Sequence, residues 1–150
     1  MPRVVLDVNV LVSSLINPQG STGQIQGAWR RDEISVITSN AIINKTEDVL
    51  RRPHIFALFP STRAEARIQG LLALLRNQTI LTPHALNLMV IEDDPEDDTI
   101  IIAAVEGNAD CIVSGDRHLK NLKSYRGIPI LSPAEFLAQY KIESPNIHDS

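Results

Sequence analysis

Short apolar runs alternate along this chain with longer segments that have helical periodicity. The runs of high β-propensity are residues 3–6, 35–38, 111–114 and 128–131, with a weaker one at 86–91 that is either a strand or an extended segment. Such alternation is typical of β-α units, in which parallel strands form a sheet that helices cover on both faces. The sequence therefore predicts an α/β fold with a central, mainly parallel sheet.

Capping signals predict where several helices begin. An N-cap hydroxyl followed three residues later by an acid occurs at Thr62 and at Ser132, and Ser39 precedes a helical pattern that runs through Leu50. The helix after Thr62 repeats apolar residues at helical spacing, and it is expected to bury one face. The residues on that face are Ala64, Ile68, Leu71, Leu72 and Leu75.

Length and composition fit one domain over residues 1–140, followed by a polar tail, 141–150, that is expected to be flexible. The single Cys111 has no partner for a disulfide, which fits a reducing cytosol. The apolar start of the chain is interrupted by Asp7 and Asn9 and is too short to span a bilayer. The sequence therefore predicts a cytoplasmic protein without a membrane partner.

The segment EDDPEDD, residues 92–98, places six carboxylates directly before an apolar run. Helix capping explains several of them, because Asp94 suits the N-cap and the helix dipole favours acids in the first turn. Asp98 differs, because it precedes Ile101 and Ile102 by three and four residues and so shares an apolar helix face with them. A carboxylate on that face needs a cation, a proton or water.

Two further acids follow predicted strands, Asp7 after residues 3–6 and Asp116 after residues 111–114. The carboxyl ends of parallel strands line the crevice in which α/β proteins bind ligands, so Asp7, Asp98 and Asp116 can converge there. Each acid alone is also an ordinary turn or capping residue. Crowded carboxylates repel unless a cation neutralises them, and oxygen ligands favour Mg²⁺ or Mn²⁺.

The chain resembles the PIN domain family, and within it the VapC-like toxin components of toxin-antitoxin systems. The resemblance lies in residues 4–16, 39–55, 94–119 and 128–137, which occur in family order. It implies a three-layer α/β/α sandwich and an endoribonuclease that hydrolyses RNA phosphodiester bonds with Mg²⁺ or Mn²⁺ as cofactor. It also implies a homodimer and a cognate antitoxin protein as partner.

The resemblance implies catalytic, metal-ligand roles for Asp7, Asp98 and Asp116, and it matches the usual asparagine of the family to Asn9. The chain departs from the family at position 45, where Lys45 stands in place of a glutamate ligand. An ammonium group in a metal site would leave a catalytically impaired module that binds RNA or a partner without cutting.

Two other outcomes for this position remain open. The stem of Lys45 can carry its charge away from the site, which leaves three acids to hold one ion. A shifted helix register can instead bring Glu47 into the site, although Lys45 and Glu47 flank opposite edges of the apolar stripe. Asp48 is closer to Lys45 in helical angle, but it points more toward solvent.

Groups around the proposed ligands are expected to support the chemistry. Asn9 and Ser114 would orient ligands or water, with turn and helix capping as their alternative role, and Asp97 is a candidate proton acceptor. The net charge of −4 gives no global cationic field, so RNA must contact local basic clusters. The candidate phosphate contacts are Arg51, Arg52, Arg117, His118 and Lys120.

The small number of aromatic residues argues against an extended base-stacking surface. A phosphoryl-transfer enzyme of the haloacid dehalogenase type is a third alternative, because LDVNV ends a first strand with an Asp. That family commonly has a second Asp where this chain has Asn9, so the ribonuclease and the non-cutting binding module are the main alternatives.

Overall fold

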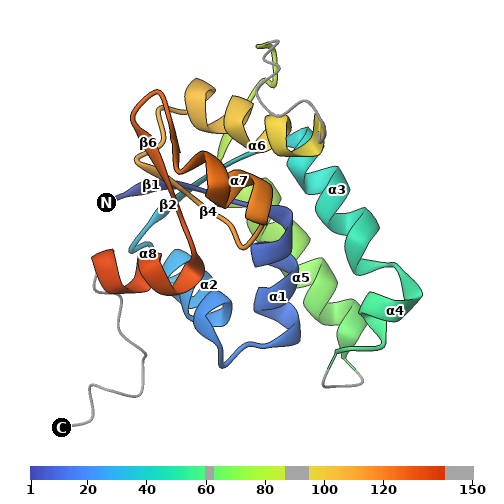
Figure 1. The fold of residues 1–150 in the computed structure, drawn as a ribbon. Coiled ribbons are helices and arrows are strands. Elements are labelled where there is room, and N and C mark those ends of the chain that lie inside the picture. Colours follow the sequence, from blue (N-terminus) through green and yellow to red (C-terminus); the bar gives the residue numbers. More distant parts are fainter. Residues whose placement is uncertain (60–62, 87–94, 141–150) are drawn as a thin grey trace, which may run out of the picture.

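The computed structural model describes residues 1–59, 63–86 and 95–140, with side chains in the helix that begins at residue 95 described from Asp98 onward. Its central sheet has the strand order β3-β2-β1-β4-β6-β5 (Figure 1). All neighbouring strands are parallel except β5, which is antiparallel to β6. The strands are β1 (Arg3–Leu6), β2 (Ser35–Ser39), β3 (Ile80–Thr82), β4 (Cys111–Val113), β5 (Ser124–Tyr125) and β6 (Ile128–Leu131).

Helices cover both faces of this sheet. Helix α6 contacts β1, β2 and β4 on one face, while α1, α2 and α8 pack together on the other, and α3 packs against α5 (Figure 1). The helices are α1 (Val8–Ile16), α2 (Ser21–Arg30), α3 (Asn40–Leu50), α4 (Pro53–Phe56), α5 (Ala64–Asn77), α6 (Pro95–Glu106), α7 (Arg117–Leu122) and α8 (Pro133–Tyr140). The predicted three-layer α/β/α sandwich is confirmed.

The sequences of the central strands are continuous apolar runs because both faces of these strands are buried in the core. Val4 and Val5 of β1 are fully buried because α1 lies on one side of the sheet and α6 on the other. Trp29 of α2 is also buried, and its indole N–H donates a hydrogen bond of 2.8 Å to the carbonyl oxygen of Gln78. This bond ties α2 to the segment between α5 and β3.

The four strong strand predictions are confirmed, although β4 ends at Val113, one residue before the predicted end. The strands β3 and β5 were not predicted, because they contain three and two residues and β3 exposes Ile80 and Leu81. The weaker candidate at 86–91 falls, apart from Leu86, outside the described residues.

Two of the three predicted helix starts are confirmed by their hydrogen bonds. Ser39 accepts from the backbone N–H of Ile42 at 3.3 Å. Ser132 and Glu135 form the expected reciprocal pair, with side chain to backbone distances of 3.1 and 2.7 Å. Arg63 occupies the cap position of α5, and Thr62 lies outside the described residues.

The predicted apolar face of α5 is buried at all five of its positions. The described part of the chain contains no helix that is long and apolar enough to cross a membrane. Residues 141–150 lie outside the described residues, so a domain boundary at residue 140 stays a prediction.

Candidate functional site

A pocket of about 560 Å³ opens beside the carboxyl ends of β1 and β4, between α1, α3 and the start of α6. Its polar lining residues are Asp7, Asn9, Ser13, Lys45, Arg52, Thr99 and Asp116. Its apolar lining residues are Val8, Val12, Ala41, Ile42, Val49, Ile55 and Ile100. Two of the three acids expected to converge therefore line one pocket.

Asp7 is placed by the end of β1 and the start of α1. Its backbone N–H donates to the carbonyl oxygen of Val113 at 3.0 Å, which continues the pairing of β1 with β4. Its side chain caps α1, because Oδ1 accepts from the N–H of Val8 at 2.7 Å. Asp7 thus both caps α1 and lines the pocket.

Asp116 occupies the equivalent position after β4. Its Oδ1 accepts from the backbone N–H groups of His118 at 2.8 Å and Leu119 at 3.3 Å, so it caps α7. These bonds hold the carboxylate at the mouth of the pocket, where a ligand can approach its second oxygen.

Ser114 joins the two acids. Its fully buried hydroxyl donates to Asp7 Oδ2 at 2.6 Å and accepts from the backbone N–H of Asp116 at 2.9 Å. The backbone N–H of Gly115 approaches Asn9 Oδ1 at 3.4 Å across the same edge. Asn9 and Ser114 therefore connect the ends of β1 and β4.

Asp98 lies in the first turns of α6, in the buried position predicted from its helix face, with 7% of its surface exposed. Among the described residues that line the pocket, α6 contributes Thr99 and Ile100, and Asp98 is not one of them. The side chain of Asp97 lies outside those that the structure describes. The third acid is thus next to the pocket wall.

Lys45 is half-buried on α3 and lines the pocket together with Asp7 and Asp116. Glu47 does not lie in the pocket, because it contacts Arg51 and Arg76 outside it. The alternative of a shifted helix register is therefore not the one seen in this structure. Asp48 is exposed and pairs with Arg52 at 3.0 Å. A cation therefore faces the pocket at the position where the resemblance implies a glutamate.

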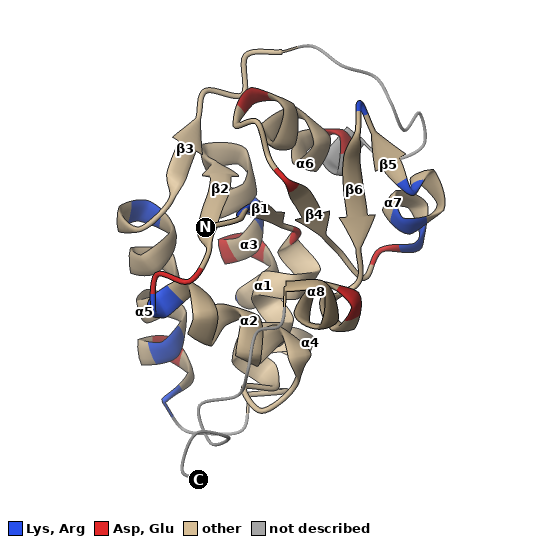
Figure 2. Ribbon diagram, turned by 90° about the vertical axis from the view of Figure 1, so that its left-hand side faces the viewer, with Lys and Arg blue, Asp and Glu red and all other residues tan. Residues whose placement is uncertain are grey.

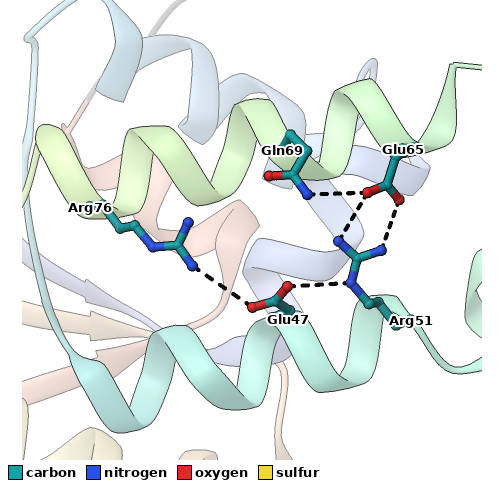
Figure 3. Close-up of polar contacts among 5 residues, drawn as sticks. All are labelled: Glu47, Arg51, Glu65, Gln69 and Arg76. Atoms are coloured by element: carbon teal, nitrogen blue, oxygen red, sulfur yellow. Dashed lines mark hydrogen bonds and ion pairs between the residues drawn. The ribbon is translucent and has the colours of Figure 1, made fainter.

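A network of ion pairs joins α3 to α5 and keeps Glu47 on the side of α5 (Figure 3). Arg51 donates to Glu65 at 2.8 and 3.1 Å and to Glu47 at 3.3 Å. Arg76 of α5 lies 3.8 Å from Glu47, and Gln69 donates to Glu65 at 3.1 Å. Because Glu47 faces α5, Lys45 faces the opposite side, toward the pocket.

The basic residues proposed for RNA contact have different environments. Arg51 belongs to the network with α5, and Lys120 is paired with Glu135. Arg52 lines the pocket, and Arg117 and His118 are exposed at the start of α7. Lys and Arg residues gather on α5 and around α7 and β5 (Figure 2). Among the described residues, the basic side chains that line the pocket are thus Lys45 and Arg52.

The pocket fits a divalent cation by its donor chemistry, since Asp7 and Asp116 offer carboxylate oxygens and Thr99 a hydroxyl. Within the described residues, no group of three His, Cys, Asp or Glu side chains is spaced to hold a metal ion. Mg²⁺ commonly keeps several waters and binds through one or two carboxylates plus substrate phosphates. The donor set therefore fits an ion whose coordination the substrate completes.

The apolar wall of the pocket and Thr99 were not predicted from the sequence. The signal was present in the spacing of Ala41, Lys45 and Val49, which recur every four residues and so share one helix face. Of these residues only Lys45 was predicted to lie at the site, and the exposure of Ala41 and Val49 to a pocket depends on α1 lying opposite them.

Comparison with known proteins gives three findings. The PIN domain family model matches residues 3–118. The chain is 27% identical over 152 residues to the uncharacterized protein MJ1680 of Methanocaldococcus jannaschii, covering 93% of this chain and 92% of that protein. Its fold is similar to that of a chain in the crystal structure of VapBC2 from Rickettsia felis bound to a DNA fragment from their promoter. The TM-score is 0.53 and the sequence identity is 13%. The similarity covers 87% of this chain and 98% of that one.

Replacing Ser114 by Ala is expected to destabilise the protein, because a buried Asp7 oxygen and the Asp116 amide each lose a hydrogen-bond partner. The free energy of unfolding should fall by about 1–3 kcal/mol, measured by urea denaturation at neutral pH. Ser13→Ala is the matched control, because that hydroxyl lines the same pocket but bonds to Thr22. An equal loss in both variants would contradict the linking role of Ser114.

The ion-pair network should make stability depend on pH. Hydrogen bonds from Arg51 and then Gln69 lower the pKa of Glu65 from 4.5 to about 2. Since the carboxylate is harder to protonate in the folded state, its stabilisation is present above pH 4.5 and is lost as the pH falls toward 2.

Glu65→Gln should therefore flatten the fall in unfolding free energy between pH 4.5 and 2, measured by urea denaturation at several pH values. Asp48→Asn is the control, because it removes an exposed carboxylate that pairs with the nearby Arg52 and not with α5. If the slope for Glu65→Gln matches that of the unmodified protein, the network does not stabilise the contact of α3 with α5.

Proposed function

Because this chain belongs to the PIN domain family, we propose that it is a metal-dependent endoribonuclease that hydrolyses RNA phosphodiester bonds at the pocket beside Asp7 and Asp116. PIN domains are generally nucleases. The observation that carries the proposal is the linked arrangement of Asp7, Ser114 and Asp116 at the carboxyl edge of the sheet, with basic residues beside it.

Mg²⁺ or Mn²⁺ is the proposed cofactor, held by Asp7 and Asp116 with Asp98 as the third acid of the site. When bound, such an ion polarises a phosphate oxygen and lowers the pKa of a water molecule. Ser114 and the amides that bond to Asp7 and Asp116 keep both carboxylates in fixed orientations. Asn9 holds the loop at Gly115 in place, and one of the three acids or their neighbour Asp97 is the proposed acceptor of the water's proton.

The cations beside the acids would contact the RNA backbone. Lys45 carries three N–H donors into the pocket, where they can bond to phosphate oxygens while the carboxylates are screened by the metal. Arg52, Arg117 and His118 are proposed phosphate contacts around the mouth of the pocket. Arg51 and Lys120 would have to exchange an exposed ion pair for a phosphate, and such pairs are weak.

We also propose that the protein is the toxin component of a toxin-antitoxin system, with a cognate antitoxin protein as partner. The support is the family together with the fold similarity to a chain of VapBC2. A homodimer in the cytoplasm is the proposed state of the molecule, with RNA as its substrate.

Replacing Asp116 by Asn should abolish metal-dependent cleavage, because it removes a carboxylate of the pocket but leaves an Oδ1 that can still cap α7. We expect the cleavage rate of a fluorescent RNA panel with Mn²⁺ to fall at least roughly 100-fold, and calorimetry to show weaker Mn²⁺ binding. Asp98→Asn should lose both properties as well.

The control is Asp48→Asn, a carboxylate on the exposed side of α3. Cleavage that persists in Asp116→Asn and Asp98→Asn at the rate of the control would overturn the acid-dependent mechanism. Thermal unfolding of each variant separates a loss of activity from a loss of the fold.

A non-cutting module that binds RNA or a partner is the second candidate function. The observation that favours it is Lys45, which lines the same pocket as Asp7 and Asp116. A fixed cation can neutralise part of the acidic charge that would otherwise attract a metal ion. In this alternative the fold of a nuclease is retained while the chemistry is lost.

Lys45→Glu distinguishes the two functions, and Lys45→Met is its matched control because it removes the charge without adding an oxygen ligand. For the non-cutting module, wild type shows no Mn²⁺ binding in calorimetry, and Lys45→Glu gains it while Lys45→Met does not. For the ribonuclease, wild type already binds Mn²⁺ and cuts RNA. Both properties are then present before Lys45 is replaced by Glu.

A further inference from the structure

A second group of cations follows Asp116 along the outer side of the sheet. Residues 117–134 contain no acid, and their four cations are Arg117, Lys120, Lys123 and Arg126. Since the net charge of the chain is −4, all other residues together carry −8. Lys and Arg residues gather on α7 and around β5, which is the outermost strand on this side of the sheet (Figure 2). An anion therefore meets a local positive field on an otherwise acidic molecule.

Three of these cations are available to an external anion. Arg117, Lys123 and Arg126 are exposed, and they form no ion pair within the described part of the chain. Lys120 differs, because it is half-buried and paired with Glu135. On α5, by contrast, acids and cations pair across the contact with α3 (Figure 3). The surface formed by Arg117, Lys123 and Arg126 is called the β5 edge below.

Two cations of the β5 edge occupy backbone conformations that favour glycine. Arg126 and Gly127 form the turn between β5 and β6, with φ of 50° and 79°. Two-residue hairpin turns with positive φ at both positions favour Asn-Gly or Asp-Gly. Lys123 has a φ of 66° at the end of α7. The chain thus keeps a positive side chain at two strained backbone positions, which indicates a role outside the fold.

Local contacts hold these two cations in place. The carbonyl oxygen of Lys123 accepts from the backbone N–H of Ile130 at 2.9 Å, which ties the backbone of Lys123 to β6. The guanidinium group of Arg126 lies over the ring of Tyr125, 5.3 Å from the ring centre. Cations that are held in this way lose less conformational freedom when they bind an anion.

The β5 edge begins at the pocket and leads away from it. Asp116 lines the pocket and caps α7, so Arg117 follows directly at its mouth. The last residue of β6, Leu131, accepts from the backbone N–H of Ser114 at 2.9 Å, whereas Arg126 lies in the turn before β6. At about 3.3 Å per residue, the length of β6 separates this turn from the level of the acids by roughly 10 Å. An anion at Arg126 therefore lies outside the pocket.

We propose that the β5 edge is a second RNA-binding surface, at which Arg117, Lys123 and Arg126 contact backbone phosphates of nucleotides that lie outside the pocket. The proposal rests on the proposed function, because it gives the path of the same RNA away from the cleaved bond. RNA is favoured over an acidic protein segment because the surface is continuous with the mouth of the pocket, where the substrate phosphate is placed. Phosphate contacts add affinity without base recognition, so this surface favours long RNA of any sequence.

The test measures the binding of a fluorescent RNA oligonucleotide to the full chain by anisotropy at several salt concentrations, in EDTA so that metal-dependent cleavage does not occur. The variant combines Lys123→Gln with Arg126→Asn. Its RNA affinity at low salt should fall at least about tenfold. The slope of log affinity against log salt should decrease by about 1.4, because each phosphate contact of a single strand contributes about 0.7.

The matched control combines Arg30→Gln with Arg31→Gln. It removes the same charge from exposed positions at the end of α2, across the sheet from β5, and it should change the affinity less than about twofold. Exchanging the two cations, Lys123→Arg with Arg126→Lys, should retain binding. Urea denaturation checks the fold: the Gln and Asn variant should unfold at the same or a higher urea concentration than wild type, because asparagine suits the turn.

Three results would overturn the proposal. Wild type that binds no RNA in EDTA has no second surface. Equal weakening in the variant and in the control would mean that only the net charge matters. Polyglutamate of matched length that binds as tightly as RNA, and loses affinity in the same variant, would assign the β5 edge to an acidic protein partner.

The proposed function fails in a different measurement, the cleavage of RNA in Mn²⁺. If wild type cuts RNA and the β5-edge variant binds it as tightly as wild type, the second surface is wrong and the ribonuclease remains. If wild type does not cut RNA at any Mn²⁺ concentration but binds it through the β5 edge, the surface remains and belongs to the non-cutting module. If both hold, the variant should raise KM for long RNA and leave kcat unchanged.

Discussion

Acid groups that lie between a sheet and its covering helices must be hydrogen-bonded, and this constraint determines the geometry of the site. Asp7 is 6% exposed, and donors from Val8 and Ser114 hold its two oxygens. The amide of Asp116 reaches the same serine, so the turns after β1 and β4 share one buried hydroxyl. Because β1 and β4 are adjacent and parallel, the loops that follow them meet, and their acids are fixed relative to each other before any ligand binds.

The orientation of α3 decides which charge faces these acids. Glu47 and Lys45 are two residues apart, so a helix that directs one of them into the pocket directs the other away from it. Arg51 and Arg76 hold Glu47 on the side of α5, and the cap by Ser39 fixes where the helix begins. Each exposed ion pair is weak alone, but the pairs share partners and act together with the buried Ile42 and Leu50 on the same helix. A lysine in the pocket is therefore a consequence of how the whole helix packs.

Much of the fold could be predicted because the strong signals are local. The runs at 3–6 and 128–131 are apolar on both faces, and Ser39 and Ser132 begin helices through bonds within one turn. The strands β3 and β5 carry no such signal, since their pairing depends on neighbours far along the chain. The site residues also differ in whether a local signal predicts them. Asp7 and Asp116 were identified because strand ends converge in parallel sheets, whereas the apolar pocket wall requires knowledge of which face of α3 lies opposite α1.

The proposed RNA binding has to be achieved by a chain with a net charge of −4. Binding through many phosphate contacts depends on a broad basic surface and weakens steeply with salt. Here two cations line the pocket together with apolar side chains, and acids lie at one end of it. The proposed RNA contact in the pocket is therefore local, with Lys45 and Arg52 as its cations. A cation at position 45 is compatible with the proposed ribonuclease, because a substrate phosphate needs a partner close to, but distinct from, the acids proposed to hold the metal.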